Sequence, residues 1–199
     1  MYSQASQDDF VDLVLNKQEI GYFVDVGGGC DDPKTESNSL LFEERGWKGI
    51  VVDGDVNRIK NRSCICVTAM IGDGNSTTRK LGDILKENGV PSIVDYLSID
   101  IEGQDFNAVK SFVDAGYTFK VATIEHNLYT QNPGVVELKS NIFNFLSVKG
   151  YIRVVENVGH EATLDNLHKG WIFEDWYIHP NYAKYKEIIQ KLKLKTVNL

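Results

Sequence analysis

The chain has 199 residues, 42% of them hydrophobic, which is enough apolar sequence for the core of one α/β domain. Its net charge of −7 argues against a broad nucleic-acid-binding surface, so nucleic acid is an unlikely partner. No stretch approaches the ~20 apolar residues that cross a bilayer, and the chain begins without a basic or apolar leader. We therefore expect no membrane association and a cytoplasmic location.

The cysteines Cys30, Cys64 and Cys66 are too few and too poorly spaced for a disulfide framework or a structural zinc site. A reducing compartment is the simplest reading of this pattern. Cys64 and Cys66 lie in an apolar run, and we expect both to be buried packing residues.

Helical and strand-like segments alternate along the first three quarters of the chain. Apolar periodicity and turn residues predict helices over residues 7–17, 37–45, 56–61, 80–86, 106–115 and 135–148. Short apolar runs predict strands over residues 23–26, 50–52, 64–70, 94–101 and 120–124. This alternation predicts a doubly wound, mostly parallel, Rossmann-like sheet.

The last quarter has a different pattern. Two strand-like segments, 151–157 and 171–178, follow one another without an intervening helix, which predicts an antiparallel hairpin at the sheet edge before a final helix. We expect residues 1–199 to form one domain, with an N-terminal helix (7–17), a core of sheet and helices (21–150), and a terminal hairpin and helix (151–199).

Acidic residues follow three of the predicted strands. Asp95-Tyr-Leu-Ser-Ile-Asp-Ile-Glu-Gly103 ends an apolar strand with Asp100 and Glu102, and Gly49-Ile-Val-Val-Asp53 ends another with Asp53. Open α/β sheets bind ligands beyond the carboxyl ends of their parallel strands. These carboxylates are therefore expected to lie on the lip of a cleft.

A glycine-rich turn follows the first predicted strand, in Gly21-Tyr-Phe-Val-Asp-Val-Gly-Gly-Gly-Cys30. Glycines let a ligand approach the backbone closely, although Gly27, Gly28 and Gly29 lack the spacing G-x-G-x-x-G of dinucleotide sites. An acid after the second strand, here Asp53, commonly accepts hydrogen bonds from both ribose hydroxyls. Together these features point to a nucleoside-containing cofactor.

Several motifs resemble, in order, those of FkbM-type S-adenosylmethionine-dependent methyltransferases, which have the class I methyltransferase fold. They are Ser6-Gln7-Asp8, Gly21-Tyr-Phe-Val-Asp-Val-Gly27, Ser37-Asn38-Ser39, Gly46-Trp47-Lys48-Gly49-Ile50, Tyr96-Leu-Ser-Ile-Asp-Ile-Glu-Gly103, Ile124-Glu-His-Asn127 and Gly150-Tyr151. The chain departs from the family at Gly28-Gly29-Cys30-Asp31-Asp32, and Asp53-Gly54 stands where the family usually has Glu followed by Pro or a small residue.

The resemblance implies methyl transfer from S-adenosylmethionine. Asp25 and the backbone of Gly27, Gly28 and Gly29 would hold the methionine portion, with Asp100 in the same cofactor site. Asp53 would hold the ribose. The segment from Ile71 to Asp73 would hold the adenine.

A second group of polar residues stands at the ends of the fourth and fifth strands: Asp100, Glu102, Glu125, His126 and Asn127. His126 is the candidate general base, with Asp100 as a second catalytic residue, because removal of a hydroxyl proton assists O-methylation. Alternatively, Asp100 and Glu125 with Asn127 or His126 could bind Mg²⁺, in an arrangement similar to that of metal-dependent O-methyltransferases.

The terminal hairpin carries aromatic residues that either line a sugar or planar acceptor pocket or belong to the core: Trp171, Phe173, Trp176, Tyr177 and His179. His160 and His168, in the connecting loop, could reach over the cleft or be solvated. We predict O-methylation of a small-molecule or carbohydrate hydroxyl. Two alternatives remain open: a nonenzymatic nucleoside-binding module, which the altered glycine turn would suit, and an NAD-dependent oxidoreductase, which the missing G-x-G-x-x-G disfavours.

Overall fold

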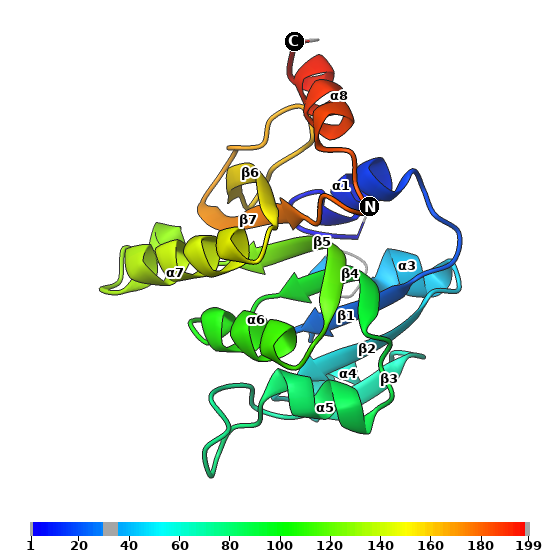
Figure 1. Ribbon diagram of the computed structural model, residues 1–199, viewed down its shortest axis with the longest axis vertical. Helices are drawn as coiled ribbons and strands as arrows, with labels where there is room; N and C mark the ends of the chain where they lie inside the picture. Colours follow the sequence, from blue (N-terminus) through cyan, green and yellow to red (C-terminus); the bar gives the residue numbers. More distant parts are fainter. Residues whose placement is uncertain (1, 30–35, 198–199) are drawn as a thin grey trace.

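The computed structural model describes residues 2–29 and 36–197, and these residues form one mixed seven-stranded sheet in the order β3-β2-β1-β4-β5-β7-β6 (Figure 1). The predicted α/β fold is thereby confirmed. The strands are β1 (Tyr22–Val26), β2 (Lys48–Asp53), β3 (Ile65–Thr68), β4 (Ile93–Ile99), β5 (Thr118–Glu125), β6 (Ile152–Gly159) and β7 (Ile172–Ile178).

Strands β1 to β5 are parallel, and β7 pairs antiparallel with both β5 and β6. The predicted C-terminal hairpin is therefore confirmed, and β6 forms one edge of the sheet. The strand order reverses between β1 and β4. The strands that follow β1 lie toward one edge of the sheet, and the strands that follow β4 lie toward the other. Such a switch point opens a crevice at the carboxyl ends of the strands.

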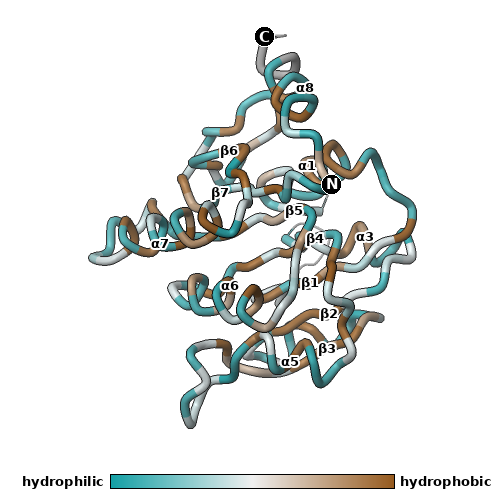
Figure 2. The backbone as a smooth tube through the Cα atoms, in the orientation of Figure 1, coloured by the Kyte–Doolittle hydropathy of each residue, from teal (hydrophilic) through white to brown (hydrophobic). Residues whose placement is uncertain are grey.

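Helices cover both faces of the sheet (Figure 1). One apolar core forms where α5 (Leu81–Glu87), α6 (Asp105–Asp114) and α7 (Val135–Val148) pack on the strands. A second forms against α1 (Gln7–Leu15), α3 (Leu40–Glu44), α4 (Val56–Ile59) and α8 (Tyr185–Val197). Because both faces are covered, the central strands contribute apolar side chains to both cores, and Figure 2 shows hydrophobic stretches at β1 and β2.

Most element boundaries lie within a few residues of the prediction. Helix α1 ends at Leu15, two residues before the expected end, because Asn16 and Lys17 both adopt positive φ angles. Strand β4 ends at Ile99 rather than at residue 101, so Asp100 is the first residue beyond the sheet. A short 3-10 turn, η1 (Leu128–Thr130), follows β5 and was not predicted.

The expectation that both strand cysteines are buried is wrong. Strand β3 is an edge strand, where Cys66 is exposed and Cys64 only half-buried. An apolar run alone does not reveal that its strand lies at an edge, where one flank has no neighbouring strand. Cys30 lies outside the described residues.

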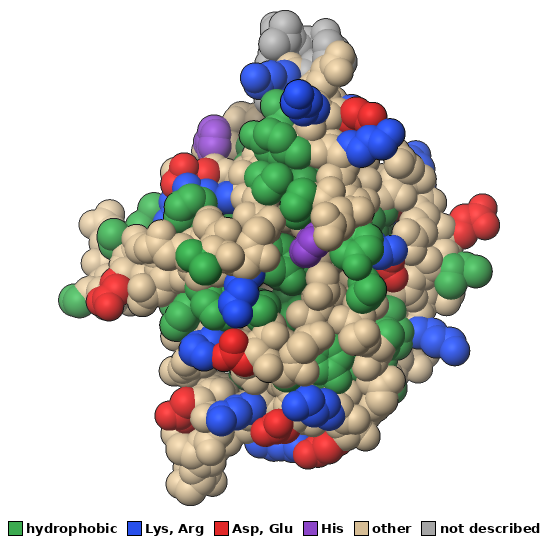
Figure 3. All heavy atoms as spheres, viewed as in Figure 1, with side chains coloured by type: hydrophobic (Ala, Val, Ile, Leu, Met, Phe, Trp, Pro, Cys, Tyr) green, Lys and Arg blue, Asp and Glu red, His purple; other side chains and the backbone are tan. Residues whose placement is uncertain are grey.

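Surface charges of both signs are interspersed over α5 in the view of Figure 3. Among the described residues, no helix is both long and apolar enough to cross a membrane.

Candidate functional site

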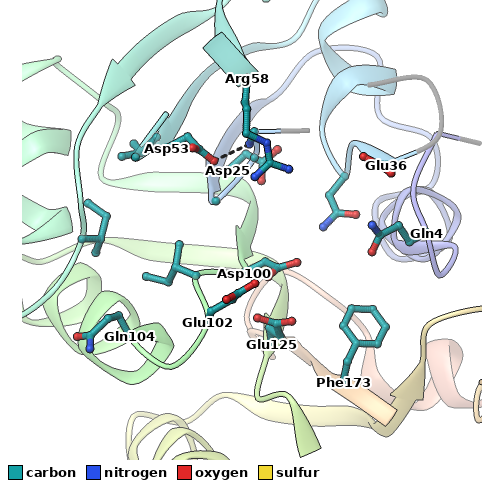
Figure 4. Close-up of a pocket in the computed structure, with 18 of the residues that line it drawn as sticks. Gln4, Asp25, Glu36, Asp53, Arg58, Asp100, Glu102, Gln104, Glu125 and Phe173 are labelled. Carbon is teal, nitrogen blue, oxygen red and sulfur yellow. Dashed lines mark hydrogen bonds between the residues drawn. The ribbon is translucent and has the colours of Figure 1, made fainter. Parts of the chain in front are cut away.

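A cavity of about 530 Å³ opens at the carboxyl ends of the parallel strands, at the switch point of the sheet (Figure 4). The three predicted strand-end acids Asp25, Asp53 and Asp100 all line it, as do Glu102 and Glu125. The sequence prediction of a cleft at this edge is thus confirmed.

The glycine turn after β1 forms the floor of the cavity. Gly27 has a φ of +80°, and a Cβ on it would lie only 1.7 Å from the carbonyl oxygen of Asp100. Its N–H donates to the carbonyl of Val52 at 2.8 Å, while the N–H of Asp100 donates to Val26 at 2.9 Å. A glycine is therefore required where the ends of β1, β2 and β4 meet.

Asp25, in β1 just before this turn, is almost fully buried, with 2% of its surface exposed. The hydroxyl of Ser39 donates to its Oδ2 at 2.5 Å, and a Cβ on Gly28 would lie 2.6 Å from the same carboxyl group. Burial raises the pKa of Asp25, and the nearby Arg62 guanidinium opposes that rise. One Asp25 oxygen thus anchors the residue that precedes α3, and the carboxyl group is partly committed to holding the turn.

Asp53, at the end of β2, connects the glycine turn to the loop before α4. Its Oδ2 accepts the N–H of Gly29 at 2.9 Å, and its Oδ1 accepts the N–H of Asp55 at 2.8 Å. Each carboxylate oxygen can accept a further hydrogen bond, so Asp53 can still bind two hydroxyl groups of a ligand.

Asp100, half-buried, and Glu125, buried, form a carboxyl pair at the ends of β4 and β5. Burial raises the pKa of both groups, and the interaction with Asp100 raises that of Glu125 further, while the hydrogen bond from Glu125 opposes the rise at Asp100. The pKa of Glu125 is thereby raised to about 11, which favours the neutral form of its carboxyl group.

Two hydrogen bonds to the carboxylate of Asp105 hold the loop that follows Asp100. Its Oδ1 accepts the N–H of Ile101 at 3.0 Å and its Oδ2 accepts that of Gly103 at 2.8 Å. Burial raises the pKa of Asp105 to about 6. This clamp fixes Glu102, which has a φ of 51°, at the lip of the cavity.

His126 does not line the cavity, and the geometry does not favour its predicted role as general base. Its side chain is 1% exposed. Its Nδ1 accepts the N–H of Leu128 at 3.2 Å, so Nε2 carries the proton toward Asp175 Oδ1 at 3.3 Å. Both ring nitrogens are thereby occupied by hydrogen bonds to Leu128 and Asp175, which is a structural role.

Two of the predicted magnesium ligands, Asp100 and Glu125, line the cavity, whereas Asn127 is not one of the residues that line it. Among the described residues, no group of three His, Cys, Asp or Glu side chains suited to a metal occurs.

The predicted adenine segment is only partly at the cavity. Ile71 lines it, whereas Asp73 lines a separate cavity between α5 and α6 and accepts a hydrogen bond from the hydroxyl of Thr78 at 3.2 Å. Asp73 is therefore not placed with the other predicted cofactor residues.

The terminal hairpin contributes one wall. Trp171, Phe173 and His160 line the cavity together with Tyr129 from η1. Trp176 and Tyr177, by contrast, are core residues, and they pack in the two cores on opposite faces of the sheet. His168, exposed, and His179 lie outside the cavity lining.

Sequence reasoning did not single out several residues of the cavity: Gln4, Glu36, Arg58, Met70, Gln104 and Tyr129. They come from loops and helix ends that carry no strand-end pattern. Arg58, which extends into the cavity from α4 in Figure 4, is the lining residue with a permanent positive charge among those described. Its charge opposes the rise in the pKa of Asp100 that burial causes.

Comparison with models of known protein families gives no match to this chain, and no curated protein matches it.

Proposed function

We propose that this protein is an S-adenosylmethionine-dependent methyltransferase of the FkbM type that methylates a hydroxyl of a small molecule or carbohydrate. The observation that carries the proposal is the convergence of Asp25, Asp53 and Asp100, with the Gly27 turn, on one cavity at the switch point of the sheet. This is where α/β sheets bind nucleoside cofactors.

The residues present fit the cofactor. Asp53 retains acceptor capacity for two ribose hydroxyls, and Ile71 provides an apolar contact for the adenine. Asn38, from the motif before α3, donates its amide to Ser98 at 3.1 Å but has a buried Oδ1 without a hydrogen-bond partner among the described residues. Asn38 lines the cavity, and its unpartnered oxygen suits the amino group of the methionine portion.

When bound, S-adenosylmethionine supplies a methyl group activated by its sulfonium charge. The protein must then hold the acceptor hydroxyl in line and take its proton. Asp100, rather than His126, is the proposed proton acceptor, because it lines the cavity. Glu125, whose hydrogen bond opposes the rise in the pKa of Asp100, would position it.

Calorimetric titration with S-adenosylmethionine and S-adenosylhomocysteine, with and without magnesium, tests the cofactor. NAD serves as the control ligand. Binding of both S-adenosyl compounds but not of NAD is the expected result, and Asp53→Asn should weaken it. If neither compound binds under either condition, or if NAD binds in their place, the methyltransferase proposal fails.

Binding alone would not separate an enzyme from a nonenzymatic module. An acceptor screen that measures release of S-adenosylhomocysteine makes that distinction. Turnover with any hydroxyl acceptor, lost in Asp100→Asn while cofactor binding is kept, would support O-methylation with Asp100 as the base.

A further inference from the structure

Three aromatic rings form a shelf at the hairpin side of the cavity. Trp171 stacks on Tyr129 at a centroid distance of 5.7 Å and an angle of 28°, and on His160 at 5.3 Å and 29°. All three line the cavity. They come from three different segments, the turn after β5, the loop after β6 and the residue before β7, so only the folded chain assembles the shelf.

The shelf presents much of its apolar surface to solvent. Trp171 is 63% exposed and Tyr129 is 46% exposed, so the offset stacking covers only part of each ring. Large aromatic side chains that remain exposed beside a cavity mark a surface that binds a ligand. The faces of these rings carry partial negative charge and favour contact with polarised C–H groups.

The carboxyl group of Glu125 lies in the same cavity as the shelf. Glu125 is 6% exposed, and its Oε2 has no hydrogen-bond partner among the described residues. Figure 4 shows Glu125 beside Phe173, with Asp100 and Glu102 on the same side of the cavity. The carbonyl of Phe173 accepts the N–H groups of His126 and Asn127, at 2.7 and 3.0 Å, which fixes this wall.

The charges around the cavity select against an anionic acceptor. Glu36 and Glu102 line it with the strand-end acids, and Arg58 is the opposing permanent charge among the described lining residues. An acceptor bearing phosphate or carboxylate would meet repulsion from these groups. A hydroxyl group, which can both donate and accept a hydrogen bond, matches the Oε2 atom of Glu125, which has no hydrogen-bond partner among the described residues.

We propose that the acceptor of the proposed methyl transfer is a neutral sugar ring that stacks on the shelf of Tyr129, Trp171 and His160 and forms a hydrogen bond with Glu125. A pyranose has an apolar C–H face and a polar rim of hydroxyl groups, which matches an aromatic surface bordered by carboxyls. The inference rests on the proposed function only for the statement that the bound sugar is methylated. Stacking itself can be tested separately.

Tryptophan fluorescence provides the first readout. Trp47 and Trp176 are buried, so a ligand in the cavity should perturb Trp171 among the three tryptophans of the chain. The probes are methyl glucoside, methyl mannoside and methyl galactoside, each titrated in the presence of S-adenosylhomocysteine. Methyl glucuronide, glucose 6-phosphate and glucosamine are the charged comparisons, and catechol is the planar one.

We expect at least one neutral glycoside to change the fluorescence with saturation, and to bind more tightly than its charged counterparts. Trp171→Phe should retain binding. Tyr129→Ala, read by Trp171 fluorescence, should weaken it by about tenfold. Trp171→Ala, whose readout is calorimetry because the reporter is lost, should weaken it similarly. Tyr185→Ala, which removes an aromatic residue that is 40% exposed on α8, is the matched control and should leave binding unchanged.

Saturable binding of a neutral glycoside, weakened in Tyr129→Ala and Trp171→Ala but kept in Trp171→Phe, together with its methylation would support the inference. Binding of S-adenosylhomocysteine without any glycoside response would overturn it and leave the methyltransferase proposal standing. Tighter binding of catechol, glucosamine or an anionic sugar would also overturn it. Glycoside binding without S-adenosylhomocysteine binding would overturn the acceptor role together with the methyltransferase proposal.

Discussion

The imidazole Nε2 of His126 lies 3.3 Å from Oδ1 of Asp175, in a buried contact between β7 and the end of β5. Asp175 also accepts Arg153 Nη1 at 2.9 Å and the N–H of Asn157 at 2.8 Å. His126 is thus part of a buried polar network that ties the hairpin to the parallel sheet.

We therefore expect His126→Ala to affect stability more than cofactor binding. Removing the imidazole takes one partner from Asp175, which keeps Arg153 and Asn157, and leaves the N–H of Leu128 without its acceptor, at a cost of about 1–3 kcal/mol. Urea unfolding should show this loss, while calorimetry on the folded variant should give an unchanged affinity for S-adenosylhomocysteine. His168→Ala, on the surface, is the control. A variant of normal stability that binds cofactor but does not turn over would restore His126 as the base.

Asp53→Ala and Asp73→Ala should affect cofactor binding differently, although the sequence predicted that both residues hold the cofactor. Asp53 lines the main cavity, and Asp73 lines a different one. Loss of two hydrogen bonds to a carboxylate should weaken cofactor binding by roughly 10- to 100-fold in Asp53→Ala, whereas Asp73→Ala should bind normally. Calorimetric titration measures both, and equal losses in the two variants would contradict the described geometry.

Gly27→Ala should prevent normal folding. The Cβ would lie 1.7 Å from the carbonyl oxygen of Asp100, so β1 and β4 would have to separate. Gly103→Ala is the matched control: its φ is +99°, but no heavy atom lies within 4 Å of the added Cβ. It should cost only the backbone strain, about 1–3 kcal/mol. Thermal unfolding distinguishes the two, and a Gly27→Ala protein as stable as Gly103→Ala would rule out the close approach.

Glu174 makes stability depend on pH. It is buried beside Trp176, whose Nε1 donates to it at 2.6 Å, and burial raises its pKa from 4.5 to about 8. The folded state therefore retains a proton that the unfolded chain releases. This contribution is complete below pH 4.5 and is lost as the pH rises through about 8, by up to about 5 kcal/mol.

Glu174→Gln should remove that dependence, because the amide remains neutral. Urea unfolding between pH 5 and pH 9 should show the variant gaining stability relative to the natural protein as the pH rises. The exposed Glu187→Gln serves as the control and should follow the natural protein. Parallel curves for Glu174→Gln and the natural protein would show that Glu174 ionises normally.

Amide substitution of Asp100 and of Glu125 should reduce turnover to different extents. Burial and the neighbouring Asp100 raise the pKa of Glu125, so Glu125→Gln, whose side chain is also neutral, should keep turnover within about tenfold. Asp100→Asn removes the carboxylate and should reduce turnover by about 100-fold or more. Initial rates with an identified acceptor provide the measurement. The reverse order of effects would assign the proton-accepting role to Glu125.

Local pattern was sufficient for most of the fold. Apolar runs and helical periodicity predicted the alternation of strands and helices, and the missing helix before β7 predicted the antiparallel hairpin. These features depend on neighbours within a few residues. The exposed position of Cys66 could not be predicted in this way, because it depends on β3 having a single neighbouring strand.

The candidate site, like the fold, was predictable from the sequence only in part. The sequence by itself determined that acids follow the parallel strands and that glycine follows β1, so the cavity edge with Asp25, Asp53 and Asp100 was predictable. Tertiary packing decided that His126 turns to Asp175 and that Asp73 faces another cavity. It also brought Tyr129, His160 and Trp171 into contact from three segments. Residue order specifies where a strand ends, but the direction of a side chain beyond that end depends on partners far along the chain.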